Sequence, residues 1–282
     1  MKKRCCTTGK WCLFFSCVLC LMWVFSLTTD AQTSQQSKTT EAALNLALKT
    51  ETESLAIPPI DASAPAVFET ASFGLGCFWG IESRFGIIDG VIRTRVGYAG
   101  GRQDNPDYGN IGDHTETVQV DYDPQRISYP ELLDIFWQSH KPTGRSWSRQ
   151  YMNAVFYHDD RQRQAAMDSK TDVEKTLGQT VKTEVVPLRT FTMAEDYHQK
   201  YIIKQHYDLN AEMSRIYPLH RNFVDSTAVA RLNGYASGHG DKDQLAREID
   251  RLGLTEAGKK LSLIHISEPT RPILVSRMPS SA

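Results

Sequence analysis

One cysteine stands apart from the others in a setting suited to a nucleophile. Six cysteines occur in the 282 residues, and five of them lie within the first 20 positions, which leaves Cys77 alone in the rest of the chain. Cys77 follows Gly74 and Gly76 and precedes a stretch with helical spacing. Backbone N–H groups and the positive end of a helix dipole stabilise a thiolate, so this position predicts a lowered pKa for Cys77. A buried structural thiol is the alternative, because free cysteine is among the most buried residue types.

A carboxyl group shares the apolar face of a predicted strand. Residues 114–122 alternate with a period of two. This period places Glu116 on the same face as Val118 and Val120. Burial on such a face disfavours the charged form of a carboxyl and raises its pKa, so that it can donate a proton near neutral pH. A solvated Glu116 at the strand end is the alternative, since glutamate is rarely fully buried.

Two short patterns contain residues that bind metals, and neither is complete. His114-x-Glu116 would place two ligands on one strand, and Glu195-x-x-His198 is half of a carboxylate-bridged di-iron motif. A second Glu-x-x-His is absent from the sequence. We therefore expect no metal site, and we interpret His198 as a surface or core residue of a capped helix.

The elements that would position these residues alternate between strands and helices. Strands are predicted at residues 67–75, 92–98, 114–122 and 152–157, and helices at residues 78–86 and 128–140. Their order, β-α-β-β-α-β, is that of the ferredoxin-like unit. We predict an α+β fold, a two-layer sandwich with a ferredoxin-like βαββαβ core and a mixed sheet.

Further elements are predicted after this core. They are a helix at residues 160–177 closed by Gly178, a strand at residues 181–186, and a helix opened by a capping box of Thr192 and Glu195. The catalytic domain is expected to span residues 67–220, followed by a C-terminal extension at residues 221–260.

The two ends of the chain differ in composition from the middle. A basic start, an uncharged apolar run at residues 11–27 and an exit at Ala31 predict a signal peptide or membrane anchor over residues 1–31. Export into the secretory pathway follows from either form, with membrane contact only through this segment and organelle targeting as the weaker alternative. Residues 32–66 predict a flexible linker. Residues 261–282 resemble a translated sequencing-adapter peptide and are expected to be a non-native tail.

Composition and charge exclude several classes of protein. An apolar content of 40% with 10% aromatic residues is typical of a globular protein and not of a disordered or multi-span chain. The 32 basic and 33 acidic residues nearly cancel, so no field exists to attract phosphate backbones. Nucleic acid is therefore not an expected partner.

Several short blocks of sequence, beginning with the one around Cys77, form a recognisable pattern along the chain. Gly76-Cys77-Phe78-Trp79-Gly80 comes first. The blocks that follow are Gly97–Gly101, Asn105–Tyr108, Gly112–Glu116, Asp123-Pro124, His140–Thr143, Ser148–Tyr151 and Ala194–Gln199. In content and order they resemble the peptide methionine sulfoxide reductases of the A class. The resemblance covers about residues 68–208 and continues more weakly to near residue 260.

The resemblance implies a role for each of six residues. They are the catalytic Cys77, Glu116, Tyr108 and Tyr151, and the substrate-binding Phe78 and Trp79. Cys77 would attack the sulfoxide sulfur and Glu116 would protonate the departing oxygen. Tyr108 and Tyr151 would donate hydrogen bonds to that oxygen, and the two aromatic residues would hold the S-methyl group. The products would be methionine and a Cys77 sulfenic acid, formed from the S epimer of protein-bound or free methionine sulfoxide in the repair of oxidised proteins.

Three departures from the family pattern affect the expected chemistry. Many members carry an Asp in the loop where this chain has residues 145–149, and the loop between Tyr108 and His114 is short. No cysteine occurs between residues 78 and 260 to resolve the sulfenic acid. An external thiol, supplied by thioredoxin, glutaredoxin or glutathione, is therefore the expected reductant. If the tail is non-native, a resolving cysteine lost from the C-terminus is the alternative. No bound cofactor or metal is implied, and a monomer is expected.

Two other functions fit parts of the pattern. A cysteine hydrolase would use Cys77 with His114 or His198 as its base. A non-catalytic methionine-binding module would use Phe78 and Trp79 to bind apolar side chains and leave Cys77 idle.

Overall fold

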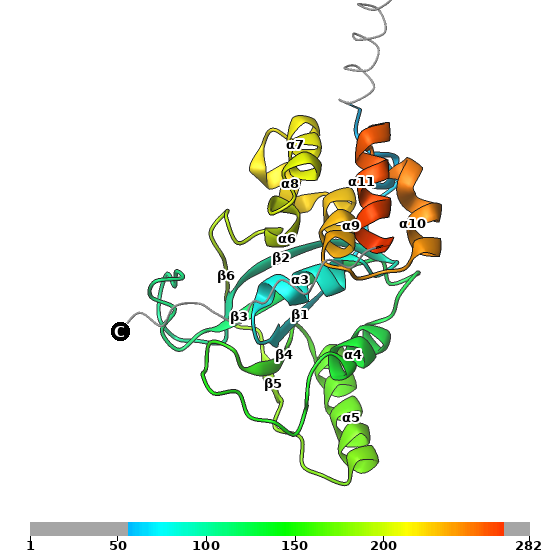
Figure 1. Ribbon diagram of the computed structural model, residues 1–282. Helices are drawn as coiled ribbons and strands as arrows, with labels where there is room; N and C mark the ends of the chain where they lie inside the picture. The colour runs from blue at the N-terminus through cyan, green and yellow to red at the C-terminus, as the bar shows by residue number, and fades with distance from the viewer. Residues whose placement is uncertain (1–55, 268–282) are drawn as a thin grey trace, which may run out of the picture. The chain divides into compact units, whose positions relative to one another are not determined.

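The structure is a computed structural model that describes residues 56–267, with side chains placed up to residue 263 (Figure 1). The predicted signal peptide or anchor, most of the predicted linker and the end of the predicted tail lie outside these residues. Within them, no helix is long and apolar enough to span a membrane.

Six strands form one mixed sheet in the order β5-β4-β1-β3-β2-β6. The strands are β1 (Glu69–Leu75), β2 (Val91–Ala99), β3 (Thr115–Tyr122), β4 (Asn153–Tyr157), β5 (Glu184–Pro187) and β6 (Phe191–Met193). Only β4 and β5 pair in parallel among these strands, and the other neighbours are antiparallel. The predicted α+β class with a mixed sheet is confirmed.

Helices pack against the sheet and against one another. They are α2 (Pro59–Ala62), α3 (Phe78–Gly86), α4 (Tyr129–Gln138), α5 (Asp160–Leu177), α6 (Tyr201–Lys204), α7 (Tyr207–Ile216), α8 (His220–Asp225), α9 (Thr227–Ala236), α10 (Lys242–Glu248) and α11 (Glu256–Ser267), with a 3₁₀ turn at Ile249–Arg251. Helices α4 and α5 pair near β4 and β5, whereas α8 and α9 contact β2 (Figure 1).

Local capping signals place two of the helix ends as predicted. At the start of α4, the Ser128 backbone N–H donates to the Glu131 carboxylate at 2.8 Å, and the Glu131 N–H donates to the Ser128 hydroxyl at 3.4 Å. This is a capping box. Helix α5 ends at Gly178, whose φ of 62° is left-handed and favours glycine.

The second predicted capping box, at Thr192 and Glu195, is wrong. Thr192 lies in β6, which pairs with the edge of β2. The Glu195 carboxylate accepts hydrogen bonds from the Tyr98 hydroxyl at 2.8 Å and the Tyr108 N–H at 2.9 Å. The next helix begins only at Tyr201. The local pattern is typical of a helix start. The backbone of Thr192, however, pairs with β2 as part of a strand.

The main core lies between the sheet and helices α3, α4 and α5. Phe73 of β1 stacks between Phe85 of α3 and Phe136 of α4, with ring centroids 5.1 Å apart in both pairs. Such stacking of large side chains contributes beyond the burial of apolar area alone. It fixes α3, the helix that follows Cys77, against the centre of the sheet.

A second core joins the C-terminal helices to the other side of α3. A Cβ atom at Gly86 would lie 2.7 Å from the Ala230 carbonyl of α9, and one at Gly234 would lie 2.7 Å from Ile87 Cβ. These distances are too short for any side chain. Two glycines therefore allow α3 and α9 to pack with their backbones in contact.

The last part of the predicted linker is folded in this core. Asp61 of α2 accepts hydrogen bonds from the backbone N–H groups of Thr227 and Ala228 at the start of α9. Its carboxylate also accepts from the hydroxyls of Tyr217 at 2.6 Å and Ser226 at 2.8 Å. A carboxylate at a helix N-terminus satisfies free N–H groups and stabilises the helix.

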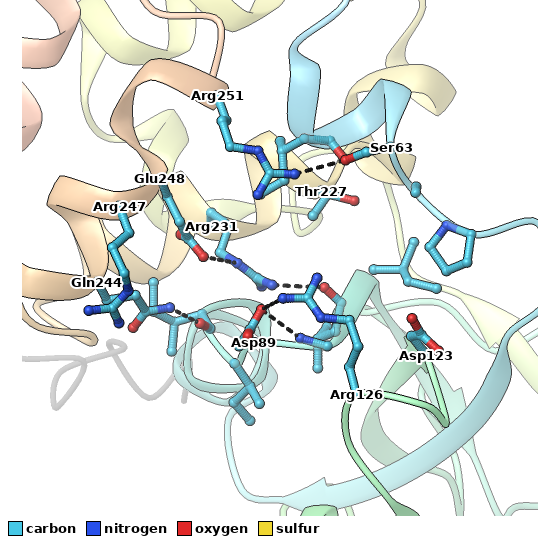
Figure 2. Close-up of a pocket in the computed structure, with 18 residues that line it drawn as sticks. Ser63, Asp89, Asp123, Arg126, Thr227, Arg231, Gln244, Arg247, Glu248 and Arg251 are labelled. Carbon is cyan, nitrogen blue, oxygen red and sulfur yellow. Dashed lines mark hydrogen bonds and ion pairs between the residues drawn. The ribbon is translucent and has the colours of Figure 1, made fainter.

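A cavity of about 540 Å³ lies beside the C-terminal end of α3, and Cys77 does not line it (Figure 2). The buried Arg231 guanidinium crosses it to Glu248 at 3.3 Å and to the Val91 carbonyl at 3.1 Å. Arg251 donates to the Ser63 hydroxyl at 2.8 Å (Figure 2). These contacts tie α9 to α10 and to the start of β2, and they tie the 3₁₀ turn to the segment after α2.

A buried ion pair holds the middle of α3. Lys200 Nζ lies 2.7 Å from Glu82 Oε1, and both side chains are fully buried. The Lys200 N–H donates to the other oxygen of Glu82 at 2.7 Å, and Nζ also donates to the Thr94 carbonyl. Lys200 has a φ of 52°, a conformation that non-glycine residues rarely adopt. The pair therefore fixes the segment before α6 against α3.

We expect Lys200→Met to lower the free energy of unfolding by about 3–5 kcal/mol, because it leaves the Glu82 carboxylate buried without a cation. Urea denaturation followed by circular dichroism measures this change. The double variant Glu82→Leu, Lys200→Met removes both charges and should recover most of the loss. A single variant within about 1 kcal/mol of the wild type would contradict the assigned role.

Candidate active site

Cys77 occupies the N-cap of α3, directly after β1. Gly76 has a φ of 77°, which glycine adopts without strain and which turns the chain from strand to helix. The thiol is half-buried, and the backbone N–H groups of Trp79 and Gly80 in the first turn act to lower its pKa. The predicted position at a helix start is confirmed.

Strand β3 brings Glu116 to the same helix start. Glu116 is 1% exposed, so the alternative of a solvated carboxylate is wrong. Its Oε2 accepts a hydrogen bond from the Phe78 N–H at 3.0 Å. Its Oε1 accepts from Gln150 Nε2 at 2.7 Å, and the Glu116 N–H donates to the Gln150 carbonyl at 2.8 Å. Gln150, which precedes β4, was not predicted as a site residue, although it lies within the Ser148–Tyr151 block.

Burial gives Glu116 the titration expected of an acid catalyst. Desolvation raises its pKa to about 7, while the hydrogen bonds from Gln150 and Phe78 act in the opposite direction. A carboxyl with this pKa holds a proton in a large share of molecules at neutral pH. It can therefore donate that proton in a reaction.

The predicted lowering of the Cys77 pKa is wrong. Burial, followed by the negative charge of Glu116, raises the pKa of the thiol to about 11. The N–H groups of Trp79 and Gly80 lower it, but by less. The sequence shows the helix start, whereas the depth of the thiol and the nearby carboxylate come from the fold. Cys77 is therefore a protonated thiol in the free protein at neutral pH.

Two tyrosine hydroxyls face this thiol and carboxyl. Tyr108 and Tyr151 lie close enough to shift each other's pKa, and burial raises the pKa of both. The charges of Glu116 and Cys77 raise both pKa values further, so the four groups lie close enough to interact electrically. Both hydroxyls keep their protons and can donate hydrogen bonds to an oxygen atom bound beside Cys77.

Aromatic side chains form the apolar part of the site. Phe78 is buried and Trp79 is half-buried. The Trp79 indole stacks on Tyr201, with centroids 3.7 Å apart and planes at 5°, and its Nε1 donates to His198 Nδ1 at 2.9 Å. Phe78 lies 5.0 Å from the His198 ring. The orientation of the indole is therefore fixed on its face and at its edge.

His198 and Tyr201 are part of the site that sequence reasoning missed. His198 is buried in a turn before α6 and not on a capped helix. Burial lowers its pKa to about 4, so the ring is neutral. Since Nδ1 accepts from Trp79, Nε2 carries the proton, 3.9 Å from Glu195 Oε2. The only signal for His198 is its place in the Ala194–Gln199 block.

The ring of His114 faces away from this chemistry. His114 Nδ1 accepts from the Gly101 N–H at 3.3 Å, and Nε2 donates to the Gln103 carbonyl at 2.8 Å. Both nitrogens therefore serve the loop after β2. In the part of the chain that the structure describes, no group of three or more His, Cys, Asp or Glu is arranged to hold a metal ion.

The site combines a half-buried thiol with a carboxyl that titrates near pH 7. Two hydroxyl donors and aromatic side chains complete it. These groups suit a thiol-based oxidoreductase that acts on a polarised oxygen. A family model described as peptide methionine sulfoxide reductase matches residues 69–231, more than half of the chain. The chain belongs to this family. It catalyses the thiol-dependent reduction of methionine S-sulfoxide and so repairs oxidised proteins.

Individual relatives agree with this family. A peptide methionine sulfoxide reductase of Drosophila melanogaster is 41% identical over 202 residues, which cover 71% of this chain and 80% of that protein. Peptide methionine sulfoxide reductase MsrA 1 of a Synechocystis species is 40% identical, covering 59% of this chain and 85% of that protein. Among solved structures, reduced Mxr1 from Saccharomyces cerevisiae is 28% identical, covers 51% of this chain and 89% of its own, and has a TM-score of 0.48.

We expect alkylation of Cys77 by iodoacetamide to accelerate with pH to a midpoint near 11, because only the thiolate reacts and burial raises its pKa. Mass spectrometry of the Cys77 peptide measures this rate separately from the other cysteines. In Glu116→Gln the midpoint should fall, since the neighbouring negative charge is gone. A rate that saturates below pH 8.5 would show instead that the helix start dominates the thiol.

Proposed function

We propose that Cys77 attacks the sulfoxide sulfur while Glu116 supplies a proton to the departing oxygen. The observation that carries this proposal is the buried Glu116 carboxyl, titrating near pH 7 beside Cys77 and hydrogen bonded to the first N–H of α3. In the net step, the sulfoxide sulfur loses its oxygen and gains two electrons, and Cys77 loses two electrons and gains the oxygen. The thiol proton ends on the sulfenic acid, so atoms and electrons balance.

One shared proton is central to this step. The ionised Glu116 raises the Cys77 pKa, so the thiolate forms most readily when the proton lies on Glu116. The state with a thiolate and a carboxylic acid contains both the nucleophile and the acid. It has the same total charge as the state with a thiol and a carboxylate. The two differ only in the position of that proton.

Tyr108 and Tyr151 are proposed to donate hydrogen bonds to the sulfoxide oxygen. Negative charge grows on this oxygen as its bond to sulfur breaks, so donors aimed at it stabilise the transition state more than the bound substrate. Phe78 and Trp79 are proposed to hold the S-methyl group. The indole is already oriented by His198 and by stacking on Tyr201, which supports a preformed pocket.

An external thiol is proposed to return Cys77 to its reduced form. Cys77 is the one free cysteine among residues 56–267. Attack of a first thiol on the sulfenic acid gives a mixed disulfide and water, and attack of a second releases the Cys77 thiol and an external disulfide. A thioredoxin-like protein, glutaredoxin or glutathione supplies suitable thiols, and no bound cofactor is needed for these steps.

Two structural assignments are also proposals. We infer a ferredoxin-like core from the central strand order β4-β1-β3-β2, in which α3 joins β1 to β2 and α4 joins β3 to β4. We infer export or membrane anchoring from the basic and apolar composition of residues 1–31. The expected monomer stays a prediction.

The geometry gives less support to the two other functions. A hydrolase needs a base beside Cys77, but both ring nitrogens of His114 bond to the loop after β2, and His198 Nδ1 accepts from Trp79. A passive methionine-binding module needs no buried acid or tyrosine pair.

We expect Glu116→Gln to retain the fold and to slow single-turnover reduction of methionine S-sulfoxide by about 10²–10⁴-fold near neutral pH, the usual contribution of a general acid. Rapid quench with a peptide substrate measures the rate. The exposed carboxyl of Glu256 offers a matched control, because Glu256→Gln removes a charge that lies outside the site. Wild-type rates in Glu116→Gln would remove this residue from the mechanism.

The pH profile of the same experiment tests the shared proton. Below pH 7 both Cys77 and Glu116 are protonated, and one proton must leave before the thiolate can form. The wild-type rate should therefore rise tenfold per pH unit up to about pH 7 and then stay constant toward pH 11. In Glu116→Gln only the thiolate limits the reaction, so the rate should keep rising through this range. Parallel profiles would contradict the coupling.

We expect one sulfenic acid to form on Cys77 when the protein reacts with methionine S-sulfoxide without reductant. Dimedone trapping and mass spectrometry detect it, and Cys77→Ser should give none. An intramolecular disulfide in the untreated full chain would show that a second cysteine resolves the intermediate.

A further inference from the structure

Five aromatic rings form a row across the site. Tyr197 lies 4.1 Å from His198, and His198 lies 4.6 Å from Tyr108, measured between ring centroids. Tyr151 lies near Tyr108, since each shifts the other's pKa, and the Tyr151 ring lies 5.2 Å from that of Trp147. The three middle residues are buried or half-buried, but the ends are open to solvent, with Trp147 84% and Tyr197 54% exposed.

The loop that carries Trp147 is tied down on several sides. Arg149 donates to the carbonyls of Asp113 at 3.3 Å and Gly100 at 3.4 Å. Its guanidinium also lies 3.5 Å from the Glu184 carboxylate of β5. These contacts attach the loop to the ends of three strands. The indole is therefore presented to solvent by an anchored segment, beside Tyr151.

We propose that Trp147 and Tyr197, together called the aromatic rim, bind apolar side chains on either side of the oxidised methionine in a polypeptide substrate. The proposal rests on the assignment of Tyr108 and Tyr151 to the sulfoxide oxygen. The rim rings stand at opposite ends of the row that contains these tyrosines. A methionine sulfoxide bound at the centre would carry its neighbouring residues, spaced about 3.5 Å apart along the chain, toward both ends.

The chemistry of the rim favours apolar neighbours. Large exposed aromatic side chains are enriched at binding surfaces, where they add contact area with little loss of conformational entropy. Neither rim ring carries a charge, and exposed rings attract a lysine or arginine side chain only weakly because the cation stays hydrated. Free methionine sulfoxide has no neighbouring residues that could contact the rim. The rim is thus a specificity feature for peptides and proteins, separate from the groups that act on the sulfoxide.

The test compares the full chain on three substrates with dithiothreitol as reductant, so that no reductant protein takes part. The substrates are N-acetyl-methionine S-sulfoxide, a peptide with glycine on both sides of methionine S-sulfoxide, and the same peptide with leucine on both sides. The wild type should prefer the leucine peptide. In Trp147→Ala and in Tyr197→Ala, the ratio of kcat/KM for the leucine peptide to that for the glycine peptide should fall about tenfold, mainly through KM.

Two further variants separate the rim from a general effect. Trp147→Phe keeps an aromatic ring and should retain most of the ratio. Tyr207→Ala removes an aromatic ring that is 82% exposed on α7, outside the row, and should leave every rate unchanged.

Each other outcome overturns the proposal in a recognisable way. An equal loss on all three substrates would mean that the rings act through Tyr151 and Tyr108 on the chemistry itself. An unchanged ratio with dithiothreitol, joined to slower turnover with a thioredoxin, would make the rim a surface for the reductant instead. No turnover of any substrate by the wild type would overturn the sulfoxide site and the rim with it.

Discussion

The hydrogen bond between the Phe78 N–H and the Glu116 carboxylate is the contact on which the site depends. It is 3.0 Å long and joins the start of α3 to the middle strand β3, 38 positions along the chain. A helix start offers few free N–H groups, and thiolate and carboxylate both gain from them. Here the carboxylate accepts the hydrogen bond from the Phe78 N–H, and the N–H groups of Trp79 and Gly80 act on the pKa of the thiol. Desolvation raises the pKa of both groups, and the ionised Glu116 raises that of Cys77 further, so the thiol keeps its proton to a higher pH than it would in water.

The rest of the fold keeps α3 in the position that this contact needs. At its middle, Glu82 is paired with the buried Lys200. At its C-terminal end, the Gly86 carbonyl accepts from Arg231 of α9, and the absence of a side chain at Gly86 lets the two helices touch. The second core of C-terminal helices therefore acts on the chemistry from the far end of α3. It limits the movement of the helix whose first turn holds the thiol.

Features set by neighbouring residues could be predicted from the sequence, and features set by distant contacts could not. The capping box at Ser128, the end of α5 at Gly178 and the inward face of Glu116 follow from local spacing, and the structure confirms them. The spacing of Thr192 and Glu195 is equally typical of a capping box. Thr192 nevertheless lies in a strand, because it pairs with β2. Gln150 and His198 depend on partners 34 and 119 positions away. The predicted lowering of the Cys77 pKa is wrong for the same reason. Burial, which depends on distant contacts, decides the direction of the shift, and the helix start that the sequence shows does not.

The raised thiol pKa gives the site a selectivity that a low pKa would not. Peroxides and other oxidants react with thiolates, and a thiol with a pKa near 11 is almost wholly protonated at neutral pH. In the proposed step a bound sulfoxide would change this balance, because its oxygen would accept hydrogen bonds from the two tyrosines and the proton of Glu116, and the thiolate would react as it forms. Among the described residues no second cysteine lies ready to rescue an oxidised Cys77. A site with one cysteine gains from keeping it unreactive until its substrate arrives, and burial of the thiol together with the carboxyl beside it provides that control.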